Sequence, residues 1–278
     1  MDKYYDSFCW PKEFFENDQR FQKKTKWQSY EVSQNFFQKR HGVTLTPHLL
    51  KDAKVLDLGC YLGATGYWVL NHGAKNYTGI EILKENYNFA TEHLSTHFDN
   101  SKWSLKHDEI HNFIKGCKEK YDIVIAWGVF NSFTDPILVL EDLFKLSDCI
   151  FIDCAIPMYH LDSFKTKILN GTMSMDEYRI KDLELGIVQI NPYSSMLQAR
   201  AKIAETFQGT RISLGAIKMI AERFQFKLDT TADYELQKLC PDTYGITSEA
   251  HRMMIKLVKD ASMITPLTYK DLYWKLGD

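Results

Sequence analysis

Two glycines that follow a short apolar run give this sequence its clearest chemical signal. The run Val55–Leu58 has the length and composition of a buried strand, Gly59 and Gly63 allow a tight turn, and an apolar stretch from residue 67 predicts a helix. A strand, a glycine turn and a helix N-terminus together bring free backbone N–H groups close to a nucleotide. The alternative is an ordinary strand–turn–helix corner that binds nothing.

The spacing of the glycines narrows the kind of nucleotide. A dinucleotide fingerprint, G-x-G-x-x-G, needs glycines at positions 59, 61 and 64, but Tyr61 and Ala64 occupy two of these positions. The pattern therefore disfavours a nicotinamide dinucleotide. Glu81 ends the next apolar run about 20 residues downstream, a distance at which a carboxylate can accept hydrogen bonds from both ribose hydroxyls. We predict that Glu81 binds a ribose, and the alternative is a surface glutamate at a strand end.

In the second half of the chain, four residues carry side chains that are suited to proton transfer or to substrate orientation. Asp153 lies at the end of an apolar run at 149–154, and Tyr159 and His160 follow closely, so all three are candidates for a general base. A lone histidine more often has a structural role, and that alternative applies to His160. Arg211 precedes a predicted helix and could orient an anionic or carbonyl group, or it could be a surface charge.

Apolar runs of strand length alternate with helical patterns around these residues. Strands are expected at 55–58, 76–81, 103–106, 121–126 and 149–154, with helices between them. Five such units predict an α/β fold with a doubly wound, mostly parallel sheet, in which ligands bind at the carboxyl ends of the strands. The alternation resumes with a helix over 213–224 and strands at 226–229 and 252–259.

Two segments flank the alternating core and predict the domain organisation. Residues 1–50 mix aromatic and basic side chains at loosely helical spacing, and we expect an N-terminal helical cap. Helices that merely pack on the core, or that contact RNA, are the alternatives. Residues 157–212 interrupt the alternation, and we expect an inserted helical lid or substrate subdomain there. The core then comprises residues 51–156 and 213–278.

Composition limits the possible partners. The chain has 278 residues, a net charge of −2 and 45% hydrophobic residues, so a sizeable core is available and nucleic acid is a less favourable partner than a small molecule. No apolar run is long enough to span a membrane, and the N-terminus has no signal-peptide core, so we expect a cytoplasmic protein without membrane contact. The six cysteines form no C-x-x-C pair and are expected to be reduced. Oligomeric state is not readable from these features.

The motif Asp57-x-Gly59-x-x-x-Gly63 resembles motif I of the class I S-adenosylmethionine-dependent methyltransferases. The resemblance covers residues 54–154 and, more weakly, 213–260. It implies S-adenosylmethionine as the cofactor and a seven-stranded sheet whose last strand enters antiparallel between strands 5 and 6. It also implies that Asp57 lies near the methionine ammonium group and that Gly59, Cys60, Tyr61 and Gly63 surround the cofactor.

Further positions receive cofactor roles through the same resemblance. Ile82 would flank the adenine, Asp108 or its neighbour Glu109 would accept a hydrogen bond from the adenine amino group, and Trp127 and Gly128 would lie beside the methionine. For Asp108 the alternative is an N-cap of the following helix, and for Trp127 it is core packing.

Two subgroups of the family differ from this sequence at informative places. Metal-dependent catechol-type members carry acidic and amide residues where Ala126-Trp127 and Asp153-Cys154 stand here, so no metal is expected. The stretch Gly128-Val-Phe-Asn131 followed by Asp135-Pro136 is distantly similar to the tRNA wobble-uridine carboxymethyltransferase branch. That branch has a Tyr-His pair that is absent here, which disfavours a carboxymethylated donor.

Together these features predict an enzyme that methylates a small-molecule acceptor at oxygen or nitrogen by in-line SN2 displacement. The large flanking segments would enclose such an acceptor. The alternatives are an RNA- or tRNA-modifying methyltransferase and a non-catalytic module that binds S-adenosylmethionine.

Overall fold

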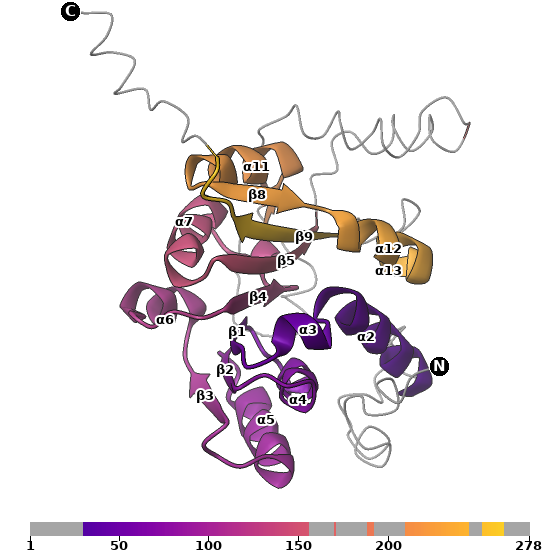
Figure 1. Ribbon diagram of the computed structural model, residues 1–278, viewed down its shortest axis with the longest axis vertical. Coiled ribbons are helices and arrows are strands. Elements are labelled where there is room, and N and C mark those ends of the chain that lie inside the picture. The colour runs from indigo at the N-terminus through magenta and orange to yellow at the C-terminus, as the bar shows by residue number, and fades with distance from the viewer. Residues whose placement is uncertain (1–29, 156–169, 171–187, 192–208, 245–251, 264–278) are drawn as a thin grey trace, which may run out of the picture.

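A seven-stranded sheet lies at the centre of the computed structural model, which describes residues 30–155, 170, 188–191, 209–244 and 252–263 (Figure 1). In sheet order the strands are β3 (Trp103–His107), β2 (Asn76–Glu81), β1 (Lys54–Leu58), β4 (Ile123–Trp127), β5 (Cys149–Ala155), β9 (Arg252–Lys259) and β8 (Phe226–Asp229). The five strands from β3 to β5 pair in parallel, and β9 runs antiparallel to both β5 and β8. The predicted fold class is therefore confirmed, including the antiparallel last strand.

The order of the strands sets the position of a ligand site. The chain proceeds from β1 outward to β3 and then returns to β4 on the other side of β1, so the strand order reverses between β1 and β4. In open α/β sheets, ligands bind outside the carboxyl ends of the strands at such a point. The ends of these two strands carry Asp57 and Trp127, and β5 continues the edge with Asp153, which pairs in register with Trp127.

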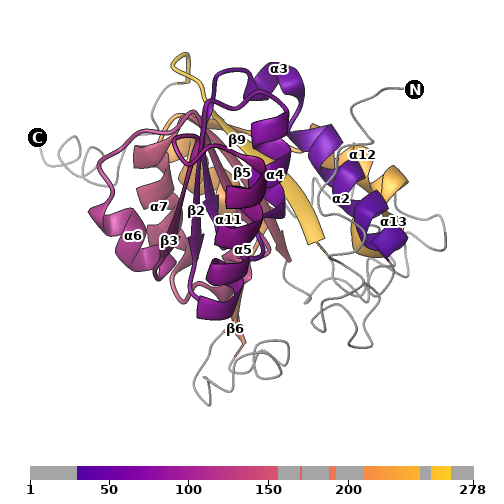
Figure 2. The same ribbon diagram turned by 90° about the horizontal axis from the view of Figure 1, so that it is seen from below.

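Helices cover both faces of the sheet, and Figure 2 shows α4 and α7 on opposite sides of it. One face packs against α6 (Ile110–Gly116), α7 (Pro136–Leu146) and α11 (Leu214–Arg223). The other face packs against α2 (Tyr30–Thr44), α3 (Pro47–Leu50), α4 (Ala64–Asn71), α5 (Lys84–His97), α12 (Thr231–Leu239) and α13 (Pro241–Tyr244). Because side chains alternate along a strand, Leu56 and Leu58 enter the first core and Val55 enters the second. Burial on both sides explains the continuous apolar runs in the sequence.

Two parts of the fold differ from the sequence prediction. No helix is predicted between residues 229 and 252, but α12 and α13 form there because Leu236, Cys240 and Tyr244 recur every four residues and are all buried. The segment predicted as a helical lid also contains two strands, β6 (Val188–Asn191) and β7 (Gly209–Ile212), which pair antiparallel and place β-branched residues opposite one another, Val188 with Ile212 and Ile190 with Thr210. The rest of residues 157–212, apart from residue 170, lies outside the described residues.

Candidate active site

The turn after β1 has the backbone geometry that its glycines predicted. Gly59 and Gly63 have φ angles of +73° and +81°, in the left-handed region that glycine adopts without strain. The N–H groups of Gly59 and Cys60 both donate to the carbonyl of Ile80 at 2.9 Å, which fixes the turn against β2. Tyr61 also has a positive φ, +53°, and its side chain is 41% exposed. The turn therefore presents backbone and one exposed aromatic ring to the edge of the sheet.

Gly59 is needed for space as well as for its backbone angle. A Cβ atom at this position would lie 2.3 Å from Cγ1 of Val129, which follows β4. We expect Gly59→Ala to displace the turn or Val129, to cost about 1–3 kcal/mol of stability and to weaken nucleoside binding about tenfold or more. Thermal unfolding and ligand titration measure both effects. Gly116→Ala is the control, because nothing lies within 4 Å of its added Cβ, and a similar loss in both variants would contradict the steric argument.

Glu81 lies at the end of β2 and is held by the turn that it faces. Its Oε2 accepts the backbone N–H of Tyr61 at 3.0 Å, and its Oε1 accepts that of Leu83 at 2.8 Å. Asn86 donates a further, longer bond of 3.4 Å to Oε1. Burial raises the pKa of Glu81, and these hydrogen bonds oppose that rise. Each oxygen keeps lone pairs for further donors, so the carboxylate is oriented in the way that a pair of ribose hydroxyls requires.

Two residues near Glu81 could contact the nucleobase of a bound nucleoside, one through an apolar and one through a polar side chain. Ile82 is 58% exposed although it is aliphatic, as expected of a side chain that covers a ligand. The backbone N–H of Asp108 donates to the carbonyl of Glu81 at 3.3 Å, which places Asp108 beside β2. Glu109, and not Asp108, caps α6 by accepting the N–H of Asn112 at 3.2 Å. The N-cap alternative for Asp108 is therefore wrong, whereas its role toward adenine stays a prediction.

Asp57 is buried on the face of the sheet that packs against α4. Its side chain is 3% exposed, and Tyr77 of β2 donates its hydroxyl to Oδ2 at 2.9 Å. Burial raises the pKa of Asp57 to about 7, while the bond from Tyr77 and the positive charge of Arg40 oppose the rise. A cation that approaches this carboxylate is therefore favoured, because it would offset the cost of keeping the charge buried.

Trp127, which is buried, and Arg40, which is partly buried, form a pair between β4 and α2. The Arg40 guanidinium carbon lies 4.4 Å from the centre of the Trp127 ring, a cation–π contact. His41 packs edge-on against the same ring at 5.0 Å, and burial holds its pKa well below the usual value, so this histidine is neutral. Nε1 of Trp127 and Nε of Arg40 are both buried and have no hydrogen-bond partner among the described residues. Two donors in a buried site without acceptors are an uncommon arrangement that a ligand oxygen would relieve.

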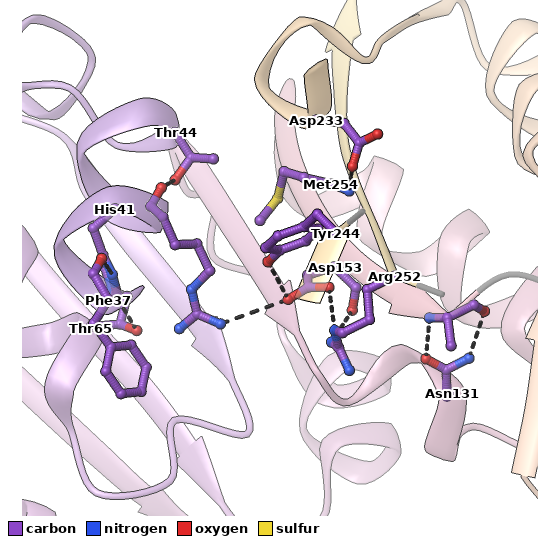
Figure 3. A network of polar contacts seen from close by, with 12 residues as sticks. Phe37, His41, Thr44, Thr65, Asn131, Asp153, Asp233, Tyr244, Arg252 and Met254 are labelled. Carbon is purple, nitrogen blue, oxygen red and sulfur yellow. Dashed lines mark hydrogen bonds and ion pairs between the residues drawn. The ribbon is translucent and has the colours of Figure 1, made fainter. Parts of the chain in front are cut away.

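Asp153 joins four elements of the fold instead of standing alone in a pocket. Its Oδ1 accepts Nε of Arg252 at 2.8 Å, and its Oδ2 accepts the hydroxyl of Tyr244 at 2.9 Å. Arg40 approaches Oδ2 at 3.7 Å. Figure 3 shows Asp153 between Tyr244 and Arg252. A carboxylate with both oxygens in ion pairs and hydrogen bonds is poorly placed to take a proton, so the base role of Asp153 stays a prediction that these contacts do not favour.

Asn131 connects the end of β5 to the hairpin that carries Arg211. Its amide nitrogen donates to the carbonyls of Ala155 and Thr210, both at 2.9 Å, and its Oδ1 accepts the N–H of Ala155 at 2.7 Å. These bonds place β7, and with it the half-buried Arg211, beside the carboxyl end of β5. Arg211 is thus near the strand ends, in register with Gln189 of β6. Its role toward a substrate stays a prediction.

The remaining predicted positions divide into described and undescribed ones. Gly128 has a φ of +74°, and its N–H donates to the carbonyl of Asp153 at 3.0 Å. Tyr159 and His160 lie outside the described residues.

Within the part of the chain that the structure describes, no group of three or more His, Cys, Asp or Glu side chains could hold a metal ion. No helix among the same residues is long and apolar enough to cross a membrane.

Several residues of the site were not predicted from the sequence. Arg40, His41, Tyr77, Tyr244 and Arg252 contact the predicted residues directly, yet none is part of a local motif. Arg40 was visible only as one of many basic residues in an aromatic segment. Tyr77 could have been found from its position on β2. It lies four residues before Glu81, and its side chain is on the same face of the sheet as that of Asp57 on the neighbouring β1.

The fold is similar to that of several solved structures, among them methyltransferases. The chain superposes on magnesium protoporphyrin IX methyltransferase from Synechocystis, solved with bound SAH, with a TM-score of 0.51 and 14% identity, over 90% of this chain and 95% of that one. It superposes on an S-adenosylmethionine-dependent methyltransferase from Mesorhizobium loti with a TM-score of 0.52 and 10% identity, over 81% and 98% of the two chains. The N-terminal domain of EvdMO1, solved in the presence of SAH and D-fucose, gives 0.55 and 13%, over 90% and 96%. These likenesses show the class I methyltransferase fold.

The sequence itself matches a family model. Residues 31–148 match the methyltransferase domain, from the first turn of α2 to the residue before β5, and so include the glycine turn, Glu81 and Trp127. No curated protein matches the sequence significantly. The domain match and the fold identify a methyltransferase, and its cofactor is S-adenosylmethionine. The glycine turn, the oriented Glu81 and the exposed Ile82 fit the adenosine part of that cofactor.

Proposed function

We propose that this protein transfers a methyl group from S-adenosylmethionine to an oxygen or nitrogen of a small-molecule acceptor. The observation that carries the proposal is the arrangement of Glu81, whose two carboxylate oxygens are oriented by the N–H groups of Tyr61 and Leu83 at the point where the strand order reverses. A small acceptor is supported by the net charge of −2 and by the acceptor named for the Synechocystis enzyme, a porphyrin. The distant similarity to the tRNA branch is less favoured, because Asn131 serves to connect β5 and β7.

The donor would be bound by residues from three strand ends. Glu81 would accept both ribose hydroxyls, Ile82 would cover the adenine, and Asp108 would accept from the adenine amino group. Asp57 would face the methionine ammonium group. S-adenosylmethionine supplies a methyl group already activated by its sulfonium, so the protein has to align the acceptor with it and exclude water.

Arg40 and Trp127 are suited to the carboxylate of the methionine part. Both present a buried N–H without an acceptor among the described residues, and Arg40 carries a positive charge. Arg40→Met retains much of the packing on Trp127 but removes the charge and the donors. We expect it to raise the Kd for S-adenosylhomocysteine about tenfold, the size of one lost charge-assisted hydrogen bond. Isothermal titration calorimetry measures this change.

Lys39→Met is the matched control for that variant, because Lys39 lies next to Arg40 on α2 but its ammonium donates to the carbonyl of Leu239 instead. An unchanged Kd in Arg40→Met, or an equal change in both variants, would count against a carboxylate role for Arg40.

The acceptor would be bound by segments that flank the core. We propose that the N-terminal cap of residues 1–50 and the inserted segment 157–212 enclose it, and that Arg211 orients it. A base is needed only if the acceptor atom carries a proton at working pH, and Tyr159, His160 and Asp153 are the candidates.

The proposed function is tested with S-adenosylmethionine that carries a labelled methyl group. The protein is incubated with a protein-free extract of small metabolites or, separately, with total tRNA, and the label is followed into each fraction. We expect label in the small-molecule fraction and formation of S-adenosylhomocysteine. Label in tRNA alone would establish an RNA methyltransferase, and tight donor binding without any transfer would establish a non-catalytic module.

A further inference from the structure

Tyr77 is a buried tyrosine beside the donor site whose hydroxyl makes a specific contact with it. The ring is 1% exposed, and the hydroxyl donates to Oδ2 of Asp57 at 2.9 Å. The described residues provide no other hydrogen bond to this carboxylate, so Oδ1 remains available to a second donor. The bond therefore fixes one oxygen of Asp57 and leaves the other for a ligand.

The surrounding chain has space for this ring because two glycines line it. A Cβ at Gly66 in α4 would lie 2.5 Å from Cε1 of Tyr77, and a Cβ at Gly79 in β2 would lie 2.9 Å from its hydroxyl oxygen. Neither glycine has a positive φ, so backbone conformation does not require them. The absence of side chains at both positions allows the tyrosine to reach across from β2 to Asp57 on β1.

We propose that Tyr77 is a positioning residue for donor binding: its hydroxyl holds the Asp57 carboxylate in the orientation in which the free oxygen meets the cationic amino group of the donor. This inference rests on the proposed function, since it takes Asp57 to be the partner of that amino group. It concerns the amino-acid part of the donor alone, because the Tyr77 hydroxyl donates to Asp57, whereas the oxygens of Glu81 accept from Tyr61 and Leu83.

The charge of Asp57 gives the proposal a pH signature. The groups that act on this carboxylate are Tyr77 and Arg40, which lower its pKa, and Glu81, which raises it together with burial; the Cys60 thiol lies beside Tyr77 and Asp57. A hydrogen bond to a carboxylate favours its charged form, so removal of the hydroxyl raises the pKa of Asp57 above its value of about 7. At neutral pH more of the variant is then protonated at Asp57 and attracts an ammonium group less.

The experiment uses Tyr77→Phe, which keeps the ring and removes only the hydroxyl. S-adenosylhomocysteine and 5′-methylthioadenosine, which lacks the amino-acid part, are titrated calorimetrically into wild type and variant between pH 6 and 9. For each ligand, the Kd of the variant is divided by the Kd of the wild type at the same pH. This ratio cancels the titration of the ligand's own amino group. We expect the ratio for S-adenosylhomocysteine to be about 5–10 at pH 6–7, to fall to about 2 at pH 8 and to approach 1 by pH 9, the effect of a pKa raised by about one unit.

For 5′-methylthioadenosine the ratio is expected to stay near 1 at every pH. Tyr121→Phe is the matched control, because Tyr121 is also a buried tyrosine but lies before β4 and donates to Glu119. A ratio of 1 for both ligands would overturn the proposal, and so would an equal loss for both, which indicates a merely structural role. Failure of the wild type to bind either ligand would overturn the proposed function itself, and the Tyr77 proposal with it.

A double-mutant cycle gives a second test that does not depend on the pH profile. In an Asp57→Asn background, loss of the Tyr77 hydroxyl should change the Kd for S-adenosylhomocysteine less than twofold, because the carboxylate through which Tyr77 acts is absent. An undiminished effect of Tyr77→Phe in that background would show that Tyr77 acts by another route. Gly66→Ala, which forces the ring to move, is expected to reproduce the selective loss for S-adenosylhomocysteine.

Discussion

Glu81→Gln is expected to raise the Kd for S-adenosylhomocysteine by about 10- to 100-fold. Each oxygen of Glu81 accepts a backbone N–H, from Tyr61 at 3.0 Å and from Leu83 at 2.8 Å. A glutamine has only one side-chain oxygen, so its amide N–H₂ would face one of these N–H groups, donor against donor. The turn or the side chain must then move, and one of the two charge-assisted bonds to the ribose is lost as well, at about 1.5–3 kcal/mol, which corresponds to the expected change in Kd.

The measurement is calorimetric titration, with unfolding of the ligand-free protein followed in parallel. Because the ribose is part of both ligands, Glu81→Gln should weaken 5′-methylthioadenosine as strongly as S-adenosylhomocysteine, which separates it from Tyr77→Phe. Glu85→Gln is the control, since Glu85 is an exposed carboxylate in the first turn of α5. A Kd within twofold of wild type in Glu81→Gln would remove the ribose role from this residue.

Asp153→Ala is expected to lower the free energy of unfolding by about 3–5 kcal/mol, the cost of breaking a buried ion pair by removal of one partner. The Asp153 side chain is 1% exposed, and its loss leaves Nε of Arg252 and the hydroxyl of Tyr244 without their acceptor. The contacts join α2, β5, α13 and β9, so the change should loosen the N-terminal helix and the C-terminal strand together. Thermal and denaturant unfolding measure the effect.

A surface ion pair provides the comparison for that variant. Asp142→Ala removes the pair with Lys145, whose side chain is 66% exposed, and should cost less than about 1 kcal/mol. Asp153→Asn separates the two roles considered for this residue. A variant of wild-type stability that binds the donor but does not turn over would support a general base, whereas a loss of stability without a specific loss of turnover supports the buried network.

The features that the sequence predicted correctly are those that depend on residues close to one another in the chain. The glycine turn, Glu81 at the end of β2 and the parallel strands each depend on residue types within about ten positions, where strand and turn preferences act directly. The turn geometry at Gly59 and Gly63 and the sheet from β3 to β8 agree with that prediction. The helices between residues 229 and 252 were not predicted, because α12 and α13 have a narrow apolar face in an otherwise polar sequence and are stabilised mainly by packing on α2 and β9.

What the sequence by itself indicated is a nucleoside site, from a strand, a glycine turn and an acid at the next strand end, and the resemblance to the methyltransferases indicated the donor. The tertiary structure alone decided which side chains support that site. Tyr244 and Arg252 lie 91 and 99 residues from Asp153, and no local pattern connects them. The bond from Tyr77 to Asp57 likewise requires the register of β1 with β2 and the space left by Gly66 and Gly79. Such contacts exist only once the sheet has formed, because it is the pairing of strands that brings distant residues to one face.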